Sequence, residues 1–264
     1  MATEQLNGFV LHRRAYRETS FLINFFTMEN GKVSAIVKGA RGAKSDKKSL
    51  LQPFQPLLVA VSGRFELKNL QQVESTGAML RLSGQALYCA LYLNEVLNRV
   101  LADDIPHPEI FVLYQQSLHA LVDTTHFEPI LRSFELGLLD ALGYGIDLTH
   151  DADAGQPLAE SGYYRIQAEL GCVYQGDIRL SGCHLGSSLL KVAGEHWDAE
   201  SLQVAKAVTR KALGELLGSK PLMSRELFKQ THFRSKGESF ERHSFRGQYR
   251  PYRHIKKRPR YPVS

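Results

Sequence analysis

The first eighty residues of this chain carry their hydrophobic side chains in short runs, and no helix-length pattern lies among them. The runs are Gly8–Leu11, Phe21–Phe26, Lys32–Val37, Pro56–Val61 and Phe65–Leu70, with turn residues between them. Asn30-Gly31, between the second and third runs, predicts a hairpin with a type I′ turn, because both residues tolerate a positive φ. About five strands in roughly seventy residues predict a small closed β-barrel of the OB-fold type over residues 1–80.

The hydrophobic pattern becomes helical at Ser83. Residues Leu87, Leu91, Val96, Leu97, Val100 and Leu101 recur at helical spacing. Further helices are predicted over Glu109–Val122 and Pro129–Leu142, and a third runs from the N-cap Asp198 to a glycine stop at Gly218.

Residues 146–183 lose the helical pattern, gain glycines and include the alternating segment Gly162–Gln167, which predicts an irregular β-like insertion. The chain is therefore predicted to be an α+β multidomain protein. An OB-fold barrel precedes a mainly helical domain over residues 81–228, and the insertion lies within that domain. Residues 229–264 are almost free of aliphatic side chains and rich in Arg, Lys and aromatic rings, so they predict a disordered basic tail.

The net charge of +6 is distributed unevenly along the chain. Residues 1–77 hold 11 Lys and Arg against 6 Asp and Glu, residues 78–228 hold 11 against 19, and residues 229–264 hold 11 against 2. Two basic ends around an acidic middle are typical of a protein that meets an anionic partner, namely nucleic acid, an acidic membrane surface or an acidic protein segment. A solvated surface with a solubilising tail is the alternative.

The candidate nucleic-acid contacts centre on a basic loop at residues 38–48, whose glycines let the backbone approach phosphates closely. The candidates within and around this loop are Lys38, Arg41, Lys44, Lys47, Lys48, Arg14, Arg17, Arg64 and Lys68. Tyr16, Phe21 and Phe65 are rings of the kind that stack on bases. In the alternative interpretation, Phe21 belongs to the barrel core and the lysines only keep the loop soluble.

A second basic group lies on the helix that starts at Asp198. Lys206, Arg210 and Lys211 stand opposite its apolar stripe, where they either extend the basic track or form an ordinary solvated face.

No catalytic residues and no cofactor are predicted. The chain contains no H-E-x-x-H, G-x-S-x-G or P-loop motif, and its paired acids lie in loops where turn and capping roles are typical. The cysteines Cys89, Cys172 and Cys183 are too widely spaced for a disulfide framework or a zinc site. No apolar stretch is long enough to span a membrane and no secretory signal is evident, so we expect a cytoplasmic protein.

Several motifs, taken in order, resemble the RecO family of bacterial DNA repair proteins. They are Val10–Ser20, Phe26-Thr27, Gly31, Lys38–Arg41, Leu51–Phe54, Tyr92–Leu97, Arg132–Leu136, Leu142–Tyr144 and Gly218–Arg225. The resemblance spans about residues 6–230. It implies an OB-fold on a helical domain and no enzymatic turnover.

The family resemblance also implies partners and sites. Such proteins bind single- and double-stranded DNA, anneal complementary strands, recognise the acidic C-terminal tail of single-stranded DNA-binding protein, and with RecR help to load RecA at the nucleoid. The basic face of the family would fall on Arg14, Arg17, Lys38, Arg41, Lys44 and Lys48. For the acidic tail, the candidate is Arg132 beside Leu136 and Leu139, although the two leucines equally fit an ordinary core.

The chain departs from the family at two points. Some members carry a four-cysteine zinc module in the insertion, whereas this chain offers only Cys172 and Cys183 there, so no zinc is inferred. The basic tail is longer than the family leads us to expect, and its composition suggests an extra nonspecific DNA or RNA contact. Two other functions compete with the family reading: an OB-fold RNA-binding translation or ribosome-assembly factor, and a metal-dependent nuclease that uses the Asp clusters.

Overall fold

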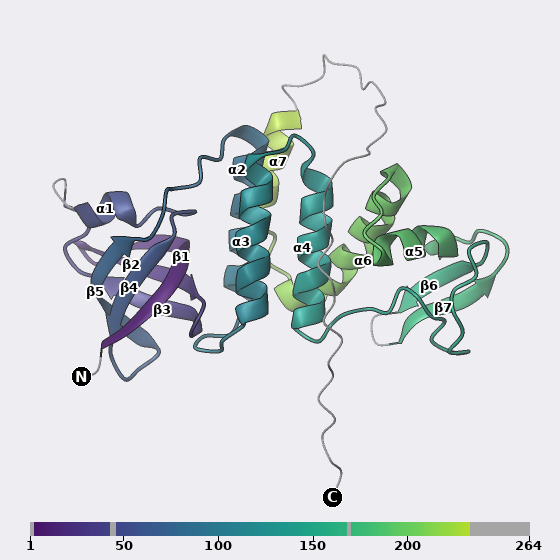
Figure 1. The fold of residues 1–264 in the computed structure, drawn as a ribbon, viewed down its shortest axis with the longest axis horizontal. Helices are drawn as coiled ribbons and strands as arrows, with labels where there is room; N and C mark the ends of the chain where they lie inside the picture. The colour runs from purple at the N-terminus through teal and green to yellow at the C-terminus, as the bar shows by residue number, and fades with distance from the viewer. Residues whose placement is uncertain (1–2, 43–45, 168–169, 233–264) are drawn as a thin grey trace, which may run out of the picture.

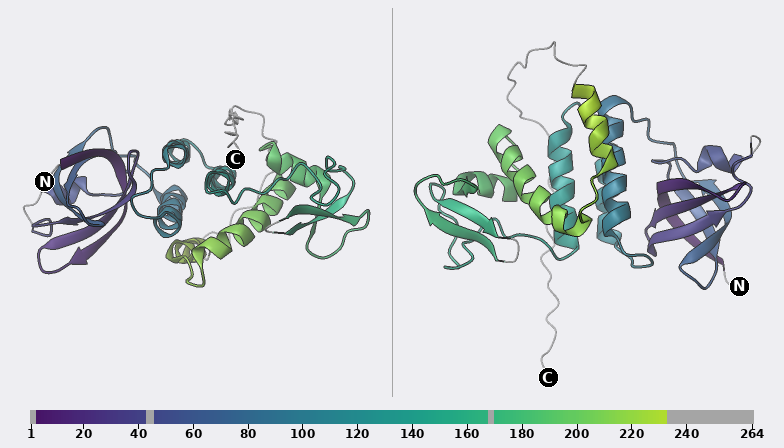
Figure 2. Two further views of the ribbon diagram at one scale, coloured as in Figure 1. Left: turned by 90° about the horizontal axis from the view of Figure 1, so that it is seen from below. Right: turned by 180° about the vertical axis from the view of Figure 1, so that it is seen from behind.

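A computed structural model describes residues 3–42, 46–167 and 170–232 of the chain. Figures 1 and 2 show a β-barrel at one end of an elongated molecule, a row of helices in the middle and a small β-sheet at the other end. The described part therefore has the predicted order of a barrel followed by a helical region with a β insertion.

The barrel consists of five strands in the closed order β1-β2-β3-β5-β4. The strands are β1 (Thr3–Tyr16), β2 (Ser20–Thr27), β3 (Gly31–Val37), β4 (Leu57–Ser62) and β5 (Leu67–Ser75). Only β3 and β5 pair in parallel, with Ser34 opposite Leu67. Fully buried side chains that include Val10, Phe25 and Val59 fill the interior, and the closed five-stranded arrangement confirms the predicted barrel.

The β2–β3 hairpin lies where the sequence predicts it, but its turn is different. Thr27 pairs with Gly31, so three residues rather than two form the loop. Gly31 has a φ of +65°, whereas Asn30 is not among the residues with a positive φ. The type I′ turn is therefore wrong, and the glycine is required for a second reason: a Cβ on Gly31 would lie 1.8 Å from the carbonyl oxygen of Ile105.

A short helix, α1 (Asp46–Leu50), interrupts the barrel between β3 and β4, and the sequence pattern did not predict it. The guanidinium of Arg13 holds this segment in place by donating to the carbonyl oxygens of Leu51, at 2.9 Å, and Lys48, at 3.3 Å. Leu51 is fully buried in the barrel core. Five residues are too few to show a helical hydrophobic pattern, so the sequence does not predict this helix and the contacts with Arg13 hold it in place.

The predicted helices are present, with small shifts at their ends. They are α2 (Gly84–Val100), α3 (Pro108–Val122), α4 (Phe127–Ala141) and α6 (Ala199–Leu217). Asp198 caps α6 by accepting a 2.7 Å hydrogen bond from the backbone N–H of Ser201, and Gly218 follows its end with a φ of +67°. Helix α4 begins two residues before Pro129 rather than at it.

Two short helices were not predicted, α5 (Gly186–Ala193) and α7 (Met223–His232). Helix α7 continues four residues into the segment predicted as a tail from residue 229. Residues 233–264 of that predicted tail lie outside the described residues.

The insertion forms a three-stranded sheet in the order β7-β6-β8, which the prediction of an irregular β-like segment anticipates only in outline. Its strands are β6 (Tyr163–Gln167), β7 (Gly171–Gly176) and β8 (Cys183–Leu185). The carboxylate of Asp151 accepts hydrogen bonds from the backbone N–H groups of Asp153, Ala154 and Tyr174. Asp151 thus has the turn-forming role expected of it. Among the described residues, no three His, Cys, Asp or Glu side chains come close enough to hold a metal ion.

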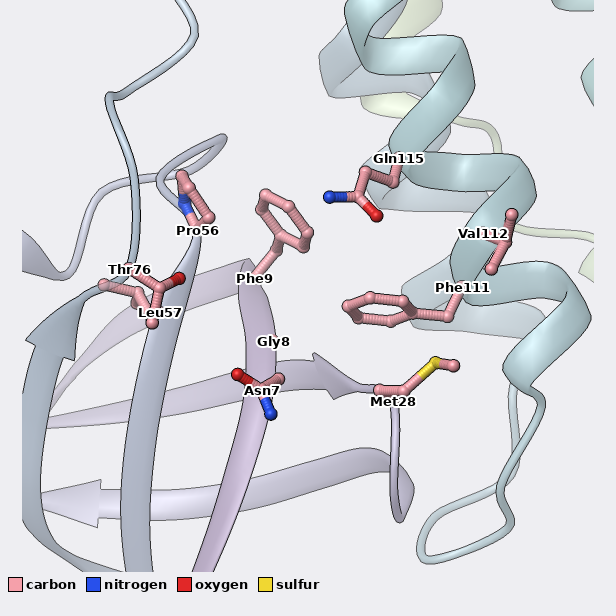
Figure 3. Close-up of a pocket in the computed structure, with 10 residues that line it drawn as sticks. All are labelled: Asn7, Gly8, Phe9, Met28, Pro56, Leu57, Thr76, Phe111, Val112 and Gln115. Carbon is pink, nitrogen blue, oxygen red and sulfur yellow. The ribbon is translucent and has the colours of Figure 1, made fainter.

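Aromatic contacts join the barrel to the helices. Phe9 and Phe26 lie on the outer surface of the barrel. The centres of their rings are 5.8 Å and 5.4 Å from the centre of the Phe111 ring on α3. Figure 3 shows the rings of Phe9 and Phe111 at the edge of a cleft that Asn7 and Gln115 also line. Among the described residues, α2 and α3 therefore cover one part of the outer barrel surface and leave another part exposed.

A buried hydrogen-bond network reinforces this junction. Asn94 on α2 donates through Nδ2 to the carbonyl oxygens of Val10, at 3.1 Å, and Leu11, at 3.3 Å. These carbonyls lie where the pairing of β1 with β2 shifts register. The hydroxyl of Tyr114 on α3 donates to Asn94 Oδ1 at 2.5 Å. One amide side chain therefore connects the barrel, α2 and α3.

Helix α2 also fixes the start of α7. The carboxylate of Glu95 accepts hydrogen bonds from the backbone N–H groups of Met223 and Ser224, each at 2.8 Å. The guanidinium of Arg99 donates to the carbonyl oxygens of Leu217, at 2.6 Å, and Lys220, at 2.7 Å. These contacts explain the structural role of the Gly218–Arg225 motif, which runs along α2.

Candidate nucleic-acid interface

The free part of the outer barrel surface begins at the row formed by Arg14, Leu22 and Ile36. Arg14 pairs with Leu22 across β1 and β2, and Leu22 pairs with Ile36 across β2 and β3. Because side chains alternate along a strand, these three face outward while their neighbours fill the barrel. In the adjacent outward row, the side chain of Asn24 donates to Asn98 of α2 at 2.7 Å. Helix α2 thus contacts that row at the half-buried Asn24, whereas Arg14 is exposed.

The β1–β2 turn brings further cations to this end of the barrel. Arg17 occupies the left-handed region with a φ of +51°, and its guanidinium lies 5.2 Å from the centre of the Tyr16 ring. The backbone N–H of Arg41 donates to Thr19 O at 3.1 Å, and the Arg41 guanidinium donates to Arg17 O at 2.7 Å. The segment after β3 is therefore tied to the turn, and Arg17, Lys38 and Arg41 lie together.

We call Arg14, Arg17, Lys38 and Arg41 the turn cluster. All four side chains are exposed. No described carboxylate forms a salt bridge with any of them. A shallow hollow of about 430 Å³ is lined by residues 16–20, Ile36 and Lys38, so Arg17 and Lys38 of the turn cluster border it together with Glu18. Unpaired surface cations around a concave site are suited to the phosphates of a nucleic-acid strand.

The remaining cations of the basic loop lie on or before α1. Lys48 is exposed and Lys47 is half-buried, and both belong to α1 next to the Arg13 contacts. Lys44 lies outside the described residues. Phe21 packs against the barrel core, and the Arg13 guanidinium lies 4.9 Å from the centre of its ring. The structure therefore favours the core interpretation of Phe21 over base stacking.

Arg64 and Lys68 form a separate group. Strands β3 and β5 run parallel with Ala35 opposite Lys68, so the turn before β5 lies toward the beginning of β3. Lys38, by contrast, follows the end of β3. The sequence presented these cations as one set around the basic loop, whereas the structure places Arg64 on the β4–β5 turn and Lys68 beside Ala35 of β3, away from the β1–β2 turn.

The cations of α6 do not join either group. Lys206 forms a 3.6 Å salt bridge with Glu128, and Lys211 donates to the carbonyl oxygen of Ile166 at 3.2 Å. Arg210 is exposed on the same helix. Figures 1 and 2 show α6 beyond α4 as seen from the barrel, so these side chains and the barrel cations do not form one continuous surface. This placement fits the solvated-face alternative.

The predicted docking site for an acidic protein tail is not supported by the structure. Arg132 is only 8% exposed, and its guanidinium bonds to the carboxylate of Glu135 at 2.5 Å and to Thr209 Oγ1 at 3.2 Å. Leu139 is 2% exposed within the helical core, and Leu136 packs against the cluster under the insertion. Arg132 therefore neutralises an internal carboxylate and presents no free cation, and the ordinary-core alternative describes Leu139.

Two family models cover most of this chain. The model described as recombination protein O N terminal matches residues 1–79, and the model described as recombination protein O C terminal matches residues 81–226. This chain belongs to the RecO family. The resemblance inferred from the ordered motifs is thereby confirmed, and the chain is a DNA repair and recombination protein.

Individual relatives agree with the RecO models. A DNA repair protein RecO of Pseudoalteromonas atlantica is 83% identical over 90% of this chain and 99% of its own length. Those of Vibrio cholerae and Haemophilus influenzae are 44% and 43% identical, over 84% and 87% of this chain and over 92% and 98% of their own lengths. This chain continues past residue 226, where the RecO C-terminal model ends. None of the described helices has the length and apolar character needed to cross a membrane.

The sequence identified the cations of this RecO surface but not the uncharged residues that give the surface its shape. Thr19 and Ile36 line the hollow of the turn cluster, and Asn94 holds the barrel against the helices. Only Asn94 left a sequence signal, because it is the first polar side chain after the run Leu87–Leu93 in α2. The positive φ of Arg17 leaves no signal, because a non-glycine residue rarely adopts it.

Proposed function

We propose that this chain acts as a recombination mediator whose barrel binds the phosphate backbone of single- and double-stranded DNA through the turn cluster. The main observation in support is the turn cluster itself, Arg14, Arg17, Lys38 and Arg41. All four side chains are exposed on a part of the barrel surface that the helices do not cover, and none forms a salt bridge with a described carboxylate. Lys44, Lys47 and Lys48 extend the proposed contact along the basic loop. Family membership supplies the DNA-repair context.

The proposed activity needs binding energy and no turnover. Cations that neutralise phosphates release condensed counterions and reduce the repulsion between two strands, while the base edges stay free to pair. Annealing of complementary strands follows from these two effects. In the same proposal, the chain helps to load RecA onto DNA covered by single-stranded DNA-binding protein, with RecR and the acidic tail of that protein as partners in the cytoplasm. Arg132, Leu136 and Leu139 are not assigned to the tail contact, because the structure engages them internally.

A salt titration of DNA binding tests the turn cluster. We would measure the anisotropy of a labelled single-stranded oligonucleotide with the full chain and with the double variant Arg17→Ala/Lys38→Ala. Removing two phosphate contacts should lower the slope of log affinity against log salt by about 1.4 and weaken binding to all sequences alike. A matched RNA strand in the same assay separates the proposal from an RNA-binding factor.

The control removes the same formal charge elsewhere. Arg179→Ala/Lys220→Ala takes two exposed cations from the insertion and from the end of α6, both outside the barrel. If the control lowers the slope as much as the turn-cluster variant does, net charge alone governs binding and the proposed site is rejected. Unchanged binding in the turn-cluster variant would reject it as well.

A further inference from the structure

We propose that the β4–β5 turn is a base-stacking contact for single-stranded DNA, with the Phe65 ring as the stacking group and Arg64 as its phosphate partner. This inference rests on the proposed function and assigns to it a second contact, separate from the turn cluster. Phe65 is 82% exposed, the highest value among the exposed large hydrophobic side chains of the described residues. Of the three rings that the sequence offered for stacking, Phe21 is partly buried against the barrel core and Tyr16 is half-buried.

The turn presents the Phe65 ring away from the barrel core. Gly63 adopts a φ of +134°, and a Cβ at this position would lie 3.5 Å from the Cα of Lys68. The chain therefore closes tightly between Gly63 and Lys68, and residues 64–66 project beyond that closure as bends, all three of them exposed. Phe65 does not belong to the barrel core or to the other two apolar clusters of the described residues.

The charges around the ring favour a nucleic-acid strand over an apolar protein partner. Arg64 is exposed directly before Phe65, Lys68 is half-buried after it, and Glu66 is the only acid between Ser62 and Lys68. A ring next to a cation matches the chemistry of an unpaired nucleotide, because the ring stacks on the base while the guanidinium meets the phosphate. Bases in a duplex are already stacked, so this contact selects single strands.

The position of the turn relative to the turn cluster fits one strand crossing the barrel. Strand β5 begins at Leu67 and rises about 7 Å from there to Asn69. Asn69 pairs with Ile36, and Lys38 lies two residues further along, or about 7 Å. The two residues from Phe65 to Leu67 add at most about 7 Å, so the path is at most about 20 Å long, which is compatible with the shorter of the sites of about 4–16 nucleotides that OB-folds bind. The cluster holds phosphates at one end of this path, and Phe65 stacks at the other.

The test compares a normal oligonucleotide with an abasic one of equal length, using the full chain. Phe65→Ala should weaken binding to the normal single strand by about 5- to 100-fold, and its salt slope should stay that of the wild type, because a stacking contact releases no counterions. The wild type should lose a similar factor on the abasic strand, where Phe65→Ala has no further effect. Phe65→Leu, which keeps an apolar side chain without a π-face, should behave like Phe65→Ala.

Ile178→Ala provides a matched control. Ile178 is 78% exposed on the β7–β8 connection, so its truncation removes a comparable exposed apolar group far from the barrel and should leave DNA binding unchanged. A fluorescent version, Phe65→Trp with Trp197→Phe, should show quenching of the indole by the normal strand and none by the abasic strand.

The outcomes separate this inference from the proposed function. If the wild type binds DNA and Phe65→Ala binds both strands as the wild type does, the stacking contact is wrong while the turn cluster stands. A Phe65→Ala defect of equal size on the abasic strand would make Phe65 a structural residue and would also overturn the inference. If the wild type binds no DNA at all, the proposed function and the stacking contact fail together.

Discussion

Replacing Asn94 tests whether one amide holds the barrel on the helices. Asn94→Ala removes the donor to the carbonyls of Val10 and Leu11 and the acceptor of the Tyr114 hydroxyl. Asn94 is 2% exposed and Tyr114 is fully buried, so water cannot replace these bonds without entering the junction. A buried polar group without a partner costs about 1–3 kcal/mol. With the small cavity that the substitution leaves, the free energy of unfolding should fall by about 3–5 kcal/mol.

The assay is equilibrium unfolding in urea, followed by far-UV circular dichroism and by the fluorescence of Trp197. Tyr114→Phe keeps the ring, whose centre lies 5.5 Å from that of Phe9, and leaves only Asn94 Oδ1 without its donor, so it should cost about 1–2 kcal/mol. Because the two substitutions remove a shared hydrogen bond, the double variant should be more stable than the sum predicts by about 1 kcal/mol. Gln116→Ala on the exposed face of α3 should stay within about 0.5 kcal/mol of the wild type. The reasoning fails if Asn94→Ala matches that control, or if the two junction variants are strictly additive.

Two further predictions concern titration. The salt bridge from Lys191 and the backbone N–H of Ser201 lower the pKa of Asp198 to about 2, so its contribution to stability is complete above its ordinary pKa of 3.8 and is lost as the pH falls through about 2. The urea midpoint should therefore drop between about pH 4 and pH 2, and Asp198→Asn should flatten that part of the profile; an equal drop in the variant would contradict this assignment. Burial raises the pKa of Cys89 and of Cys172 to about 12, so neither thiol should react with Ellman's reagent at about pH 8 until the protein unfolds; rapid native-state labelling of either would show that the core is open.

A structural feature of this chain could be predicted from the sequence when the residues that determine it lie close together in the chain. The alternation in β2 and β3, the cap at Asp198 and the stop at Gly218 each depend on residues within one element, so the pattern alone locates them. Helix α1 has too few residues for any such pattern, and contacts from Arg13 on another element fix it.

The candidate site shows the same division. The sequence by itself determined which residues are cationic, that the barrel end and the tail are basic, and which family the ordered motifs resemble. Only the tertiary structure decided how the cations are grouped, because Arg41 reaches a carbonyl 24 residues away in the β1–β2 turn and Arg132 meets a hydroxyl 77 residues away inside the helical core. Both arginines carry the same charge in the printed sequence, but packing by distant elements leaves one exposed to solvent and neutralises the other. Local preference sets the elements of this chain, whereas burial and charge pairing arise only when those elements meet.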